Sequence, residues 1–223
     1  MNLHGTGPAQ GFWALLTDDE RTVLAGLGRT AVYPPGAVMF VEGDPSTHVF
    51  VLVEGWVKIV GVTSDGHELA LRGRGDTVGE MAAETTGYRT ATVQAVGTVR
   101  ALIVAYEKFS AFLDAHDGAD RAYRRMVTRR WNDAESALRT RSVTSGAQRL
   151  AGLLLELADW RDSEVRSAMT LTQEELASLT GASRATVTRA LSNWRQRGII
   201  RTNQRDITIT DLAALRKIAG QQS

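Results

Sequence analysis

The sequence predicts an α+β protein in which a β-rich N-terminal domain is followed by a long helix and a small, mainly helical C-terminal domain. Three observations predict this order. Short Val-rich segments between residues 30 and 105 are separated by turn residues at the spacing typical of a β-barrel or β-sandwich. A helical pattern covers residues 106–141. Between residues 172 and 209, two capped helices joined by a glycine precede two short strands, which predicts a winged helix-turn-helix.

The composition excludes several classes of site. The chain has 223 residues, of which 43% are hydrophobic and 23% charged, as in an ordinary globular protein. It has no cysteine, which excludes disulfides, thiolate zinc sites and cysteine-ligated iron–sulfur clusters. The four histidines are scattered, so we expect no metal site. Neither a signal peptide nor a membrane-spanning run is visible, and we expect a cytoplasmic protein without a membrane partner.

The N-terminal segment begins with polar residues 1–10, which we expect to be loosely ordered. Thr17 is followed by Glu20 at the spacing of a capping box, which predicts the start of a helix. This helix should end between Gly26 and Gly28. Its expected apolar face comprises Val23, Leu24 and Leu27.

The β-domain should contain strands wherever β-branched residues cluster between turn signals. The predicted strands are Val49–Val53, Trp56–Val60, Glu68–Arg72, Thr90–Ala95 and Arg100–Val104. Asp65-Gly66 is typical of a hairpin turn.

Residues 77–93 carry the chemistry of this domain. A carboxylate such as Glu80 can accept hydrogen bonds from ribose hydroxyls, and the guanidinium of Arg89 can hold a phosphate with two parallel donors. The small residues between them allow backbone N–H groups to approach the same phosphate. This set suits a nucleotide with one phosphate and a free ribose hydroxyl. The alternative is that Glu80 and Arg89 form a buried ion pair and that Thr90 is an ordinary strand residue.

The helical pattern of residues 106–141 contains two apolar groups. The first group, Phe109, Phe112 and Leu113, shares one face. The second group has heptad-type spacing and comprises Val127, Trp131, Ala134 and Leu138. We interpret this seam as a dimerisation helix, with packing on the β-domain as the alternative. Residues 142–146 should break the helix and mark the domain boundary.

The C-terminal domain should begin with an apolar helix over Ala147–Trp160. Thr172 with Glu175 predicts a second capped helix, Gly181 a turn, and Ser183 the cap of the next helix. The residues expected to be buried in these two helices are Leu176, Ala177, Leu179, Val187, Ala190, Leu191 and Trp194. Strands over Ile199–Arg201 and Ile207–Ile209 should form a wing, and a last helix should span Asp211–Ala219.

A basic run favours DNA as the partner of this domain. Residues 183–205 contain six arginines and no acidic residue, although the formal net charge of the whole chain is only +1. The alternative is a solvent-exposed helix face without a nucleic-acid partner.

Taken in order, these motifs resemble the cyclic AMP receptor protein and fumarate–nitrate regulator (CRP/FNR) family of bacterial transcription factors. Three motifs carry the resemblance: residues 42–45 together with 54–58, residues 79–95, and residues 183–189. The resemblance covers about residues 12–219. It implies a double-stranded β-helix, jelly-roll-like cyclic-nucleotide-binding domain at 12–116, a dimerisation helix and hinge at 117–142, and a winged helix-turn-helix DNA-binding domain at 147–219.

The resemblance also implies roles for single residues. Glu80 would bind the ribose 2′-hydroxyl, and Arg89 with Thr90 would bind the cyclic phosphate, helped by the amides around Gly79 and Met81. Members that respond to cyclic AMP carry a Thr-Ser pair on the long helix that contacts the purine. The corresponding positions here are about Ala134 and Glu135, so the base is left open; Glu135 could accept from an amino group of adenine or guanine. Nearby alternatives are Asn132, Asp133 and Ser136.

For DNA, the resemblance implies base contacts by Arg184 and Arg189, since arginine pairs with guanine O6 and N7. Between them, Ala185 stands where the family usually has glutamate, which predicts a different half-site. The expected phosphate contacts are Ser183, Thr186, Thr188, Arg201 and Arg205.

We therefore predict a homodimeric, cyclic-nucleotide-responsive regulator of transcription that binds double-stranded DNA. Cyclic AMP is the first candidate effector, followed by cyclic GMP and a cyclic dinucleotide, and RNA polymerase is a further candidate partner. The alternative is a regulator of the same build that needs no nucleotide. No catalytic arrangement or covalent cofactor site is visible, so we do not expect an enzyme.

Overall fold

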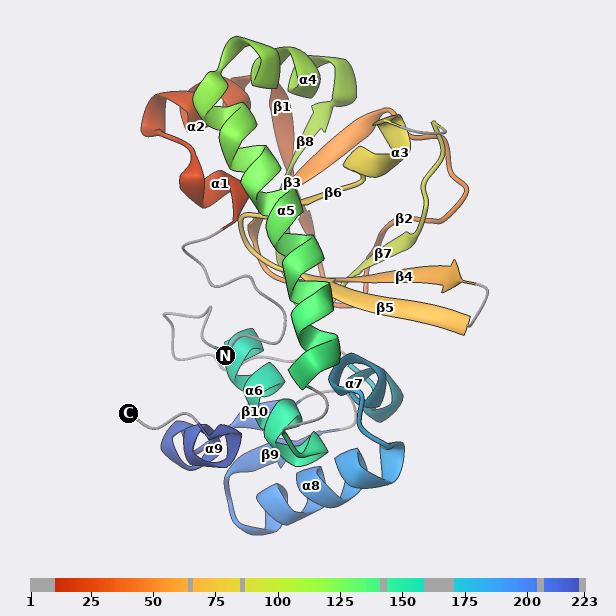
Figure 1. Cartoon of the computed structure of the whole chain (residues 1–223), viewed down its shortest axis with the longest axis vertical. Helices are drawn as coiled ribbons and strands as arrows, with labels where there is room; N and C mark the ends of the chain where they lie inside the picture. Colours follow the sequence, from red (N-terminus) through yellow and green to blue (C-terminus); the bar gives the residue numbers. More distant parts are fainter. Residues whose placement is uncertain are drawn as a thin grey trace. The chain divides into compact units, whose positions relative to one another are not determined.

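A computed structural model describes residues 11–63, 66–84, 87–140, 144–158, 171–203 and 207–220. Within these ranges, the structure describes only the backbone of residues 62, 63, 66–68, 83, 84 and 133–140. The described residues fall into two compact units that divide between Trp131 and Asn132. Figure 1 labels the helices and strands of both units.

The N-terminal unit begins with α1 (Phe12–Leu15) and α2 (Asp18–Gly26). The predicted capping box is confirmed: the Thr17 side chain accepts from the backbone N–H of Glu20, and the Glu20 carboxylate accepts from that of Thr17. Leu24 is fully buried, whereas Val23 is 44% exposed, so the predicted apolar face of this helix is partly wrong.

Two four-stranded antiparallel sheets follow. The first has the order β1 (Gly28–Tyr33), β8 (Val99–Ala105), β3 (His48–Glu54) and β6 (Thr77–Val78). The second has the order β2 (Val38–Phe40), β7 (Thr92–Ala95), β4 (Val57–Thr63) and β5 (Gly66–Arg72). Thr63 pairs with Gly66, and the predicted hairpin turn at Asp65-Gly66 lies partly outside the described residues. All five predicted strands are present with shifted ends; Thr90 precedes β7 rather than belonging to it.

One buried cluster joins the two sheets face to face. Phe50 and Ile103 contribute from the first sheet, and Val57 and Val93 from the second. The alternation of strand side chains therefore places one apolar face of each sheet in a shared core. This arrangement is the expected jelly-roll-like domain.

A second cluster packs helices on the other face of the first sheet. Phe12 and Phe109 meet edge to face at 5.7 Å between ring centroids, and Tyr123 contacts both rings. Phe109 lies in α4 (Tyr106–Ala115) and Tyr123 in α5 (Asp117–Thr140). Figure 1 shows α5 as one continuous helix. The pattern predicted over 106–141 is thus two helices that separate at His116.

The C-terminal unit contains the predicted helix-turn-helix and wing. Its elements are α6 (Gly146–Ala158), α7 (Gln173–Thr180), α8 (Arg184–Gln196), β9 (Ile200–Thr202), β10 (Ile207–Ile209) and α9 (Leu212–Ala219). Gly181 ends α7 with φ of +59°, a left-handed conformation that glycine adopts without strain. The Ser183 side chain accepts from the backbone N–H of Thr186 and caps α8. All seven residues predicted to be buried in α7 and α8 are buried.

Arg149 of α6 donates hydrogen bonds to the turn between α7 and α8. Its guanidinium is buried and donates from Nε to the Thr180 carbonyl at 2.6 Å and from Nη2 to the Gly181 carbonyl at 3.1 Å. Nη1 donates to the carbonyl of Thr144, in the segment that precedes α6. One side chain thus satisfies three backbone acceptors around the helix-turn-helix.

The described residues contain no helix with the length and hydrophobicity needed to span a bilayer. Among these same residues, no group of three or more His, Asp or Glu side chains could hold a metal ion.

Candidate nucleotide pocket and DNA-reading helix

The pocket is organised by Gly79, which joins β6 to the short helix α3 (Glu80–Glu84). Gly79 has φ of +86°, and a Cβ at this position would lie 2.1 Å from Nη1 of Arg89. Only glycine fits both the backbone conformation and this close approach. The sequence interpretation placed a turn here, and the structure shows a turn followed by one helical turn.

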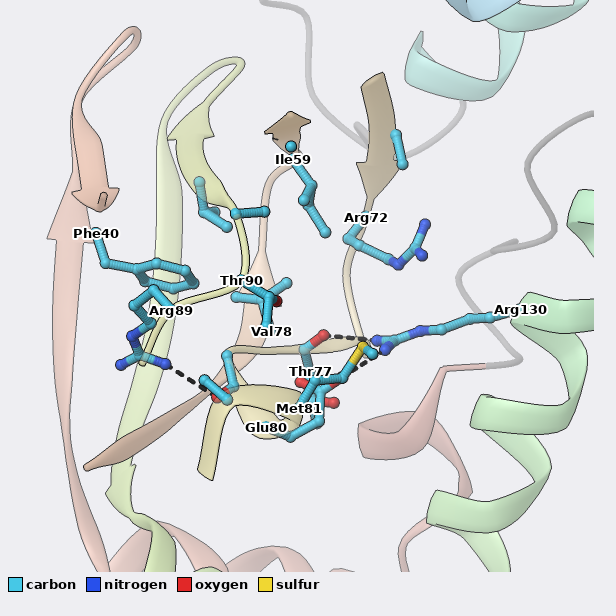
Figure 2. A pocket seen from close by; sticks show the side chains of 16 residues that line it. Phe40, Ile59, Arg72, Thr77, Val78, Glu80, Met81, Arg89, Thr90 and Arg130 are labelled. Atoms are coloured by element: carbon cyan, nitrogen blue, oxygen red, sulfur yellow. Dashed lines mark hydrogen bonds and ion pairs between the residues drawn. The ribbon is translucent and has the colours of Figure 1, made fainter. Parts of the chain in front are cut away.

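The cavity has a volume of about 290 Å³ and opens between the second sheet, α3 and α5 (Figure 2). It is lined by five of the residues predicted from the sequence: Gly79, Glu80, Met81, Arg89 and Thr90. The structure therefore brings these residues together around one space. The side chain of Glu135, the sixth predicted ligand contact, lies outside the described residues.

Glu80 is a buried carboxylate with one engaged oxygen. Its Oε1 accepts from Nη1 of Arg130 at 2.7 Å, whereas Oε2 is buried and makes no hydrogen bond within the described part of the chain. Burial alone would raise the pKa of Glu80, but the charge and hydrogen bond of Arg130 outweigh it, so the pKa lies below its ordinary value. Glu80 is therefore ionised, and its second oxygen can accept a further hydrogen bond.

Arg89 faces the same space from the segment before β7. Its Nη1 donates to the Gly79 carbonyl at 3.0 Å, and its guanidinium carbon lies 4.1 Å from the centre of the Phe40 ring. Nε is buried without a hydrogen bond in the described residues. Burial lowers the pKa of Arg89, opposed by the charges of Asp44 and Glu80, and the group remains cationic at neutral pH.

Arg130 of α5 is a pocket residue that the sequence interpretation missed. Besides its bond to Glu80, its Nη2 donates to the Thr77 carbonyl at 2.6 Å and lies 3.8 Å from Oδ1 of Asp76. Nη2 of the adjacent Arg129 lies 3.7 Å from the same oxygen. Asp76 is fully buried, and burial raises its pKa despite these cations. The only sequence signal was the basic run of α5, whose spacing does not reveal which arginine faces the pocket.

Arg72, at the end of β5, is the second pocket residue that was missed. It lines the cavity on the side away from Arg89 and near Arg130, as Figure 2 shows. Its Nη1 donates to the carbonyl of the neighbouring Leu71 at 2.8 Å. Three arginines and one carboxylate thus border the cavity, which gives it a positive character suited to an anion.

The second candidate site is the outer face of α8. Arg184, Ala185 and Arg189 are exposed on this face, as base-reading residues must be. Ser183 and Thr186 share a hydrogen bond of 2.9 Å at the helix start, and Thr186 is half-buried.

Two other predicted phosphate contacts lie near this face. The Thr188 hydroxyl lies 2.7 Å from Gln173 Oε1 and 2.9 Å from the Arg184 carbonyl, and both acceptors compete with a phosphate for its one proton. Arg201 is exposed on β9, and Arg205 lies outside the described residues.

Comparisons with known proteins match both the N-terminal and the C-terminal part of the chain. The family model described as a cyclic nucleotide-binding domain matches residues 30–116, and the Crp-like helix-turn-helix domain matches residues 148–218. The chain is 31% identical to the CRP-like cAMP-activated global transcriptional regulator of Mycobacterium tuberculosis over 193 residues, which cover 84% of this chain and 86% of the relative.

Two proteins from Thermus thermophilus are also similar to this chain. The transcriptional regulator LdrP of that species is 32% identical over 189 residues, covering 82% of this chain and 92% of the relative. The crystal structure of a CRP-family transcriptional regulator from the same species superposes with a TM-score of 0.65 at 26% identity, covering 85% of this chain and 96% of that one. The chain therefore belongs to the CRP/FNR family of transcriptional regulators, with a cyclic-nucleotide-binding domain followed by a DNA-binding helix-turn-helix.

Proposed function

We propose that this protein is a homodimer whose sequence-specific binding to DNA increases when a cyclic nucleotide occupies the pocket around Glu80 and Arg89. In this proposal residues 12–116 bind the nucleotide, 117–142 form the dimerisation helix and hinge, and 147–219 bind DNA. Cyclic AMP is the first candidate effector, because the mycobacterial relative is named as cAMP-activated. RNA polymerase is a further candidate partner.

The observation that carries the proposal is a pair of unsatisfied polar atoms on two residues that line one cavity. Oε2 of Glu80 and Nε of Arg89 are buried and lack hydrogen-bond partners among the described residues. Buried polar atoms without partners are rare in proteins and call for a missing partner such as a ligand. A ribose hydroxyl would satisfy the carboxylate oxygen, and a cyclic phosphate would satisfy the guanidinium.

The proposed mechanism is a population shift and needs no bond chemistry. A phosphate would compete with the Gly79 carbonyl for Arg89, and the ribose would share Glu80 with Arg130 of α5. Because α5 also carries the exposed Trp131 on the predicted dimer seam, nucleotide binding and dimer geometry would be coupled through one helix. The state with correctly spaced recognition helices would bind nucleotide more tightly, so nucleotide would favour that state.

Replacing Arg89 by leucine should weaken binding of cyclic AMP or cyclic GMP by about 100-fold, because a charged two-pronged phosphate contact contributes about 3 kcal/mol. Nucleotide should then no longer increase DNA binding, as measured by fluorescence anisotropy of a labelled promoter fragment. The matched control is Arg74→Leu, since Arg74 is exposed and does not line the cavity. An unchanged nucleotide response in a folded R89L variant would sink the proposal.

The alternative of a nucleotide-independent regulator is favoured by a different observation. Arg89 and Glu80 each have an internal partner already, the Gly79 carbonyl and Arg130. A structural role would explain both contacts. Titration calorimetry with cyclic AMP, cyclic GMP and cyclic dinucleotides separates the two functions, because heat from any of them contradicts the alternative and silence from all of them supports it.

Arg184→Ala should cost about 1–3 kcal/mol of affinity for the specific DNA site and much less for random DNA, because a base contact is lost. Thr188→Val should instead leave the salt dependence of binding unchanged, because a hydroxyl carries no charge and releases no counterion from DNA. Salt titrations of both variants on specific and random duplexes measure these effects. Equal losses on the two duplexes for R184A would contradict base reading.

A further inference from the structure

We infer that Arg72 selects the base of the nucleotide and favours purines with an oxygen at position 6, as in guanine and hypoxanthine, over adenine. This assignment rests on the proposed function, because it names which cyclic nucleotide the same pocket prefers. It also changes the order of candidates: the name of the mycobacterial relative favours cyclic AMP, whereas this residue favours cyclic GMP.

Arg72 belongs to β5 and lines the cavity, whereas Arg89 lies across the cavity beside Phe40 and Phe50 (Figure 2). A ligand whose phosphate meets Arg89 and whose ribose meets Glu80 extends its base away from Arg89. On β4 and β5 the cavity is lined by Ile59, Ala70 and Arg72, and we assign this side to the base.

The arginines of the pocket have different partners. A cyclic mononucleotide has one phosphate, and we assign that phosphate to Arg89. Glu80 takes its hydrogen bond from Arg130 at 2.7 Å. Arg72 donates from Nη1 to the Leu71 carbonyl at 2.8 Å, and its charge acts on the buried Asp76. Arg72 is a further cation of the pocket, on the side where a ligand held by Arg89 and Glu80 would carry its base.

Guanine and adenine differ in the hydrogen-bonding groups that they present to a guanidinium. Guanine presents two adjacent acceptors, O6 and N7, which match the parallel donors of a guanidinium. Adenine presents the N7 acceptor beside the N6 amino group, which is a donor and opposes a second guanidinium N–H. Asp76 keeps the guanidinium on this wall by charge attraction, which lowers the entropy lost when the fork engages a base.

The test is calorimetry of the full chain with cyclic AMP, cyclic IMP and cyclic GMP, on wild-type protein and on R72L, R72K and R74L. Cyclic IMP has O6 and N7 but lacks the 2-amino group of guanine, so it isolates the proposed contact. We expect wild-type protein to bind cyclic IMP and cyclic GMP about tenfold more tightly than cyclic AMP, the low end of what a bidentate base contact provides. R72L should bring the ratio close to one, R72K should keep part of it, and R74L should keep all of it.

Each outcome decides the assignment. A ratio that R72L leaves unchanged, or a wild-type preference for cyclic AMP, overturns the role of Arg72 while the proposed function stands. Binding of none of the three nucleotides to wild-type protein overturns the proposed function and the assignment with it. If R72L does not fold, as circular dichroism would show, the ratio of affinities in R72K decides. Lysine keeps the charge of arginine but not its two parallel donors, so an unchanged ratio in R72K overturns the role of Arg72.

Discussion

Replacing Arg130 by methionine should lower the free energy of unfolding of the N-terminal unit by about 3–5 kcal/mol, the usual cost of removing one partner from a buried ion pair. Arg130 is the direct hydrogen-bond partner of Glu80 and approaches Asp76, and both carboxylates are buried. Without this cation, Glu80 is a buried charge that has lost its direct ion-pair partner. Hydrogen exchange of the β3 and β8 amides, measured on the full chain, reports the loss in this unit.

The loss in R130M should grow with pH. In the wild-type protein the pKa of Glu80 lies below its ordinary value of 4.5, so ionised Glu80 stabilises the fold above that pH and the gain is lost as the pH falls. In R130M, burial raises the pKa of Glu80 instead, so the variant loses stability as the pH rises above 4.5. The difference between the two proteins should therefore be larger at pH 7 than at pH 4.

Two further variants separate this effect from a general loss of packing. Arg125→Met changes an exposed arginine of the same helix and should alter the unfolding free energy by less than about 0.5 kcal/mol. The double variant E80Q/R130M removes the uncompensated charge and should recover part of the stability. If R130M and E80Q/R130M are equally unstable, the charge of Glu80 is not the cause.

The second large effect is expected at Arg149, where replacement by methionine should destabilise the C-terminal unit by about 3 kcal/mol, since hydrogen bonds from a charged donor contribute about 1.5–3 kcal/mol each and are not additive. The side chain holds the carbonyls of Thr144, Thr180 and Gly181. These acceptors position the turn before α8, so specific DNA binding should also fall. Hydrogen exchange of the α7 and α8 amides and anisotropy with labelled DNA measure the two effects.

Arg195→Met is the control for this prediction, because Arg195 is exposed on α8 and should contribute little to stability. Arg149→Lys keeps the charge but carries its donors on a single nitrogen, which cannot reach all three carbonyls as the guanidinium does, so it should be intermediate. A stability of R149M equal to that of wild-type protein would contradict the role of this side chain.

The parts of the fold that depend on neighbouring residues were predictable from the sequence. The capping boxes at Thr17 and Thr172 and the left-handed Gly181 each depend on chemistry within three residues. The predicted positions of these helix caps were correct because the unpaired N–H and C=O groups at helix ends need a hydrogen-bond partner close by in the sequence.

What the sequence did not show depends on pairing across long separations. β1 pairs with β8, which begins some seventy residues later, and most of its side chains are exposed, so it lacks the alternation that identified other strands. Arg130 reaches Glu80 across fifty residues of sequence. The sequence of α5 holds several arginines, and only the folded domain shows that Arg130 is the one that lines the pocket.

The helix α5 extends well beyond the pocket without a break. Arg130 lies ten residues before the last residue of the helix, Thr140, which corresponds to about 15 Å along the axis at 1.5 Å per residue. The residue that meets Glu80 in the pocket therefore belongs to the same unbroken helix as residues almost three turns further along the chain.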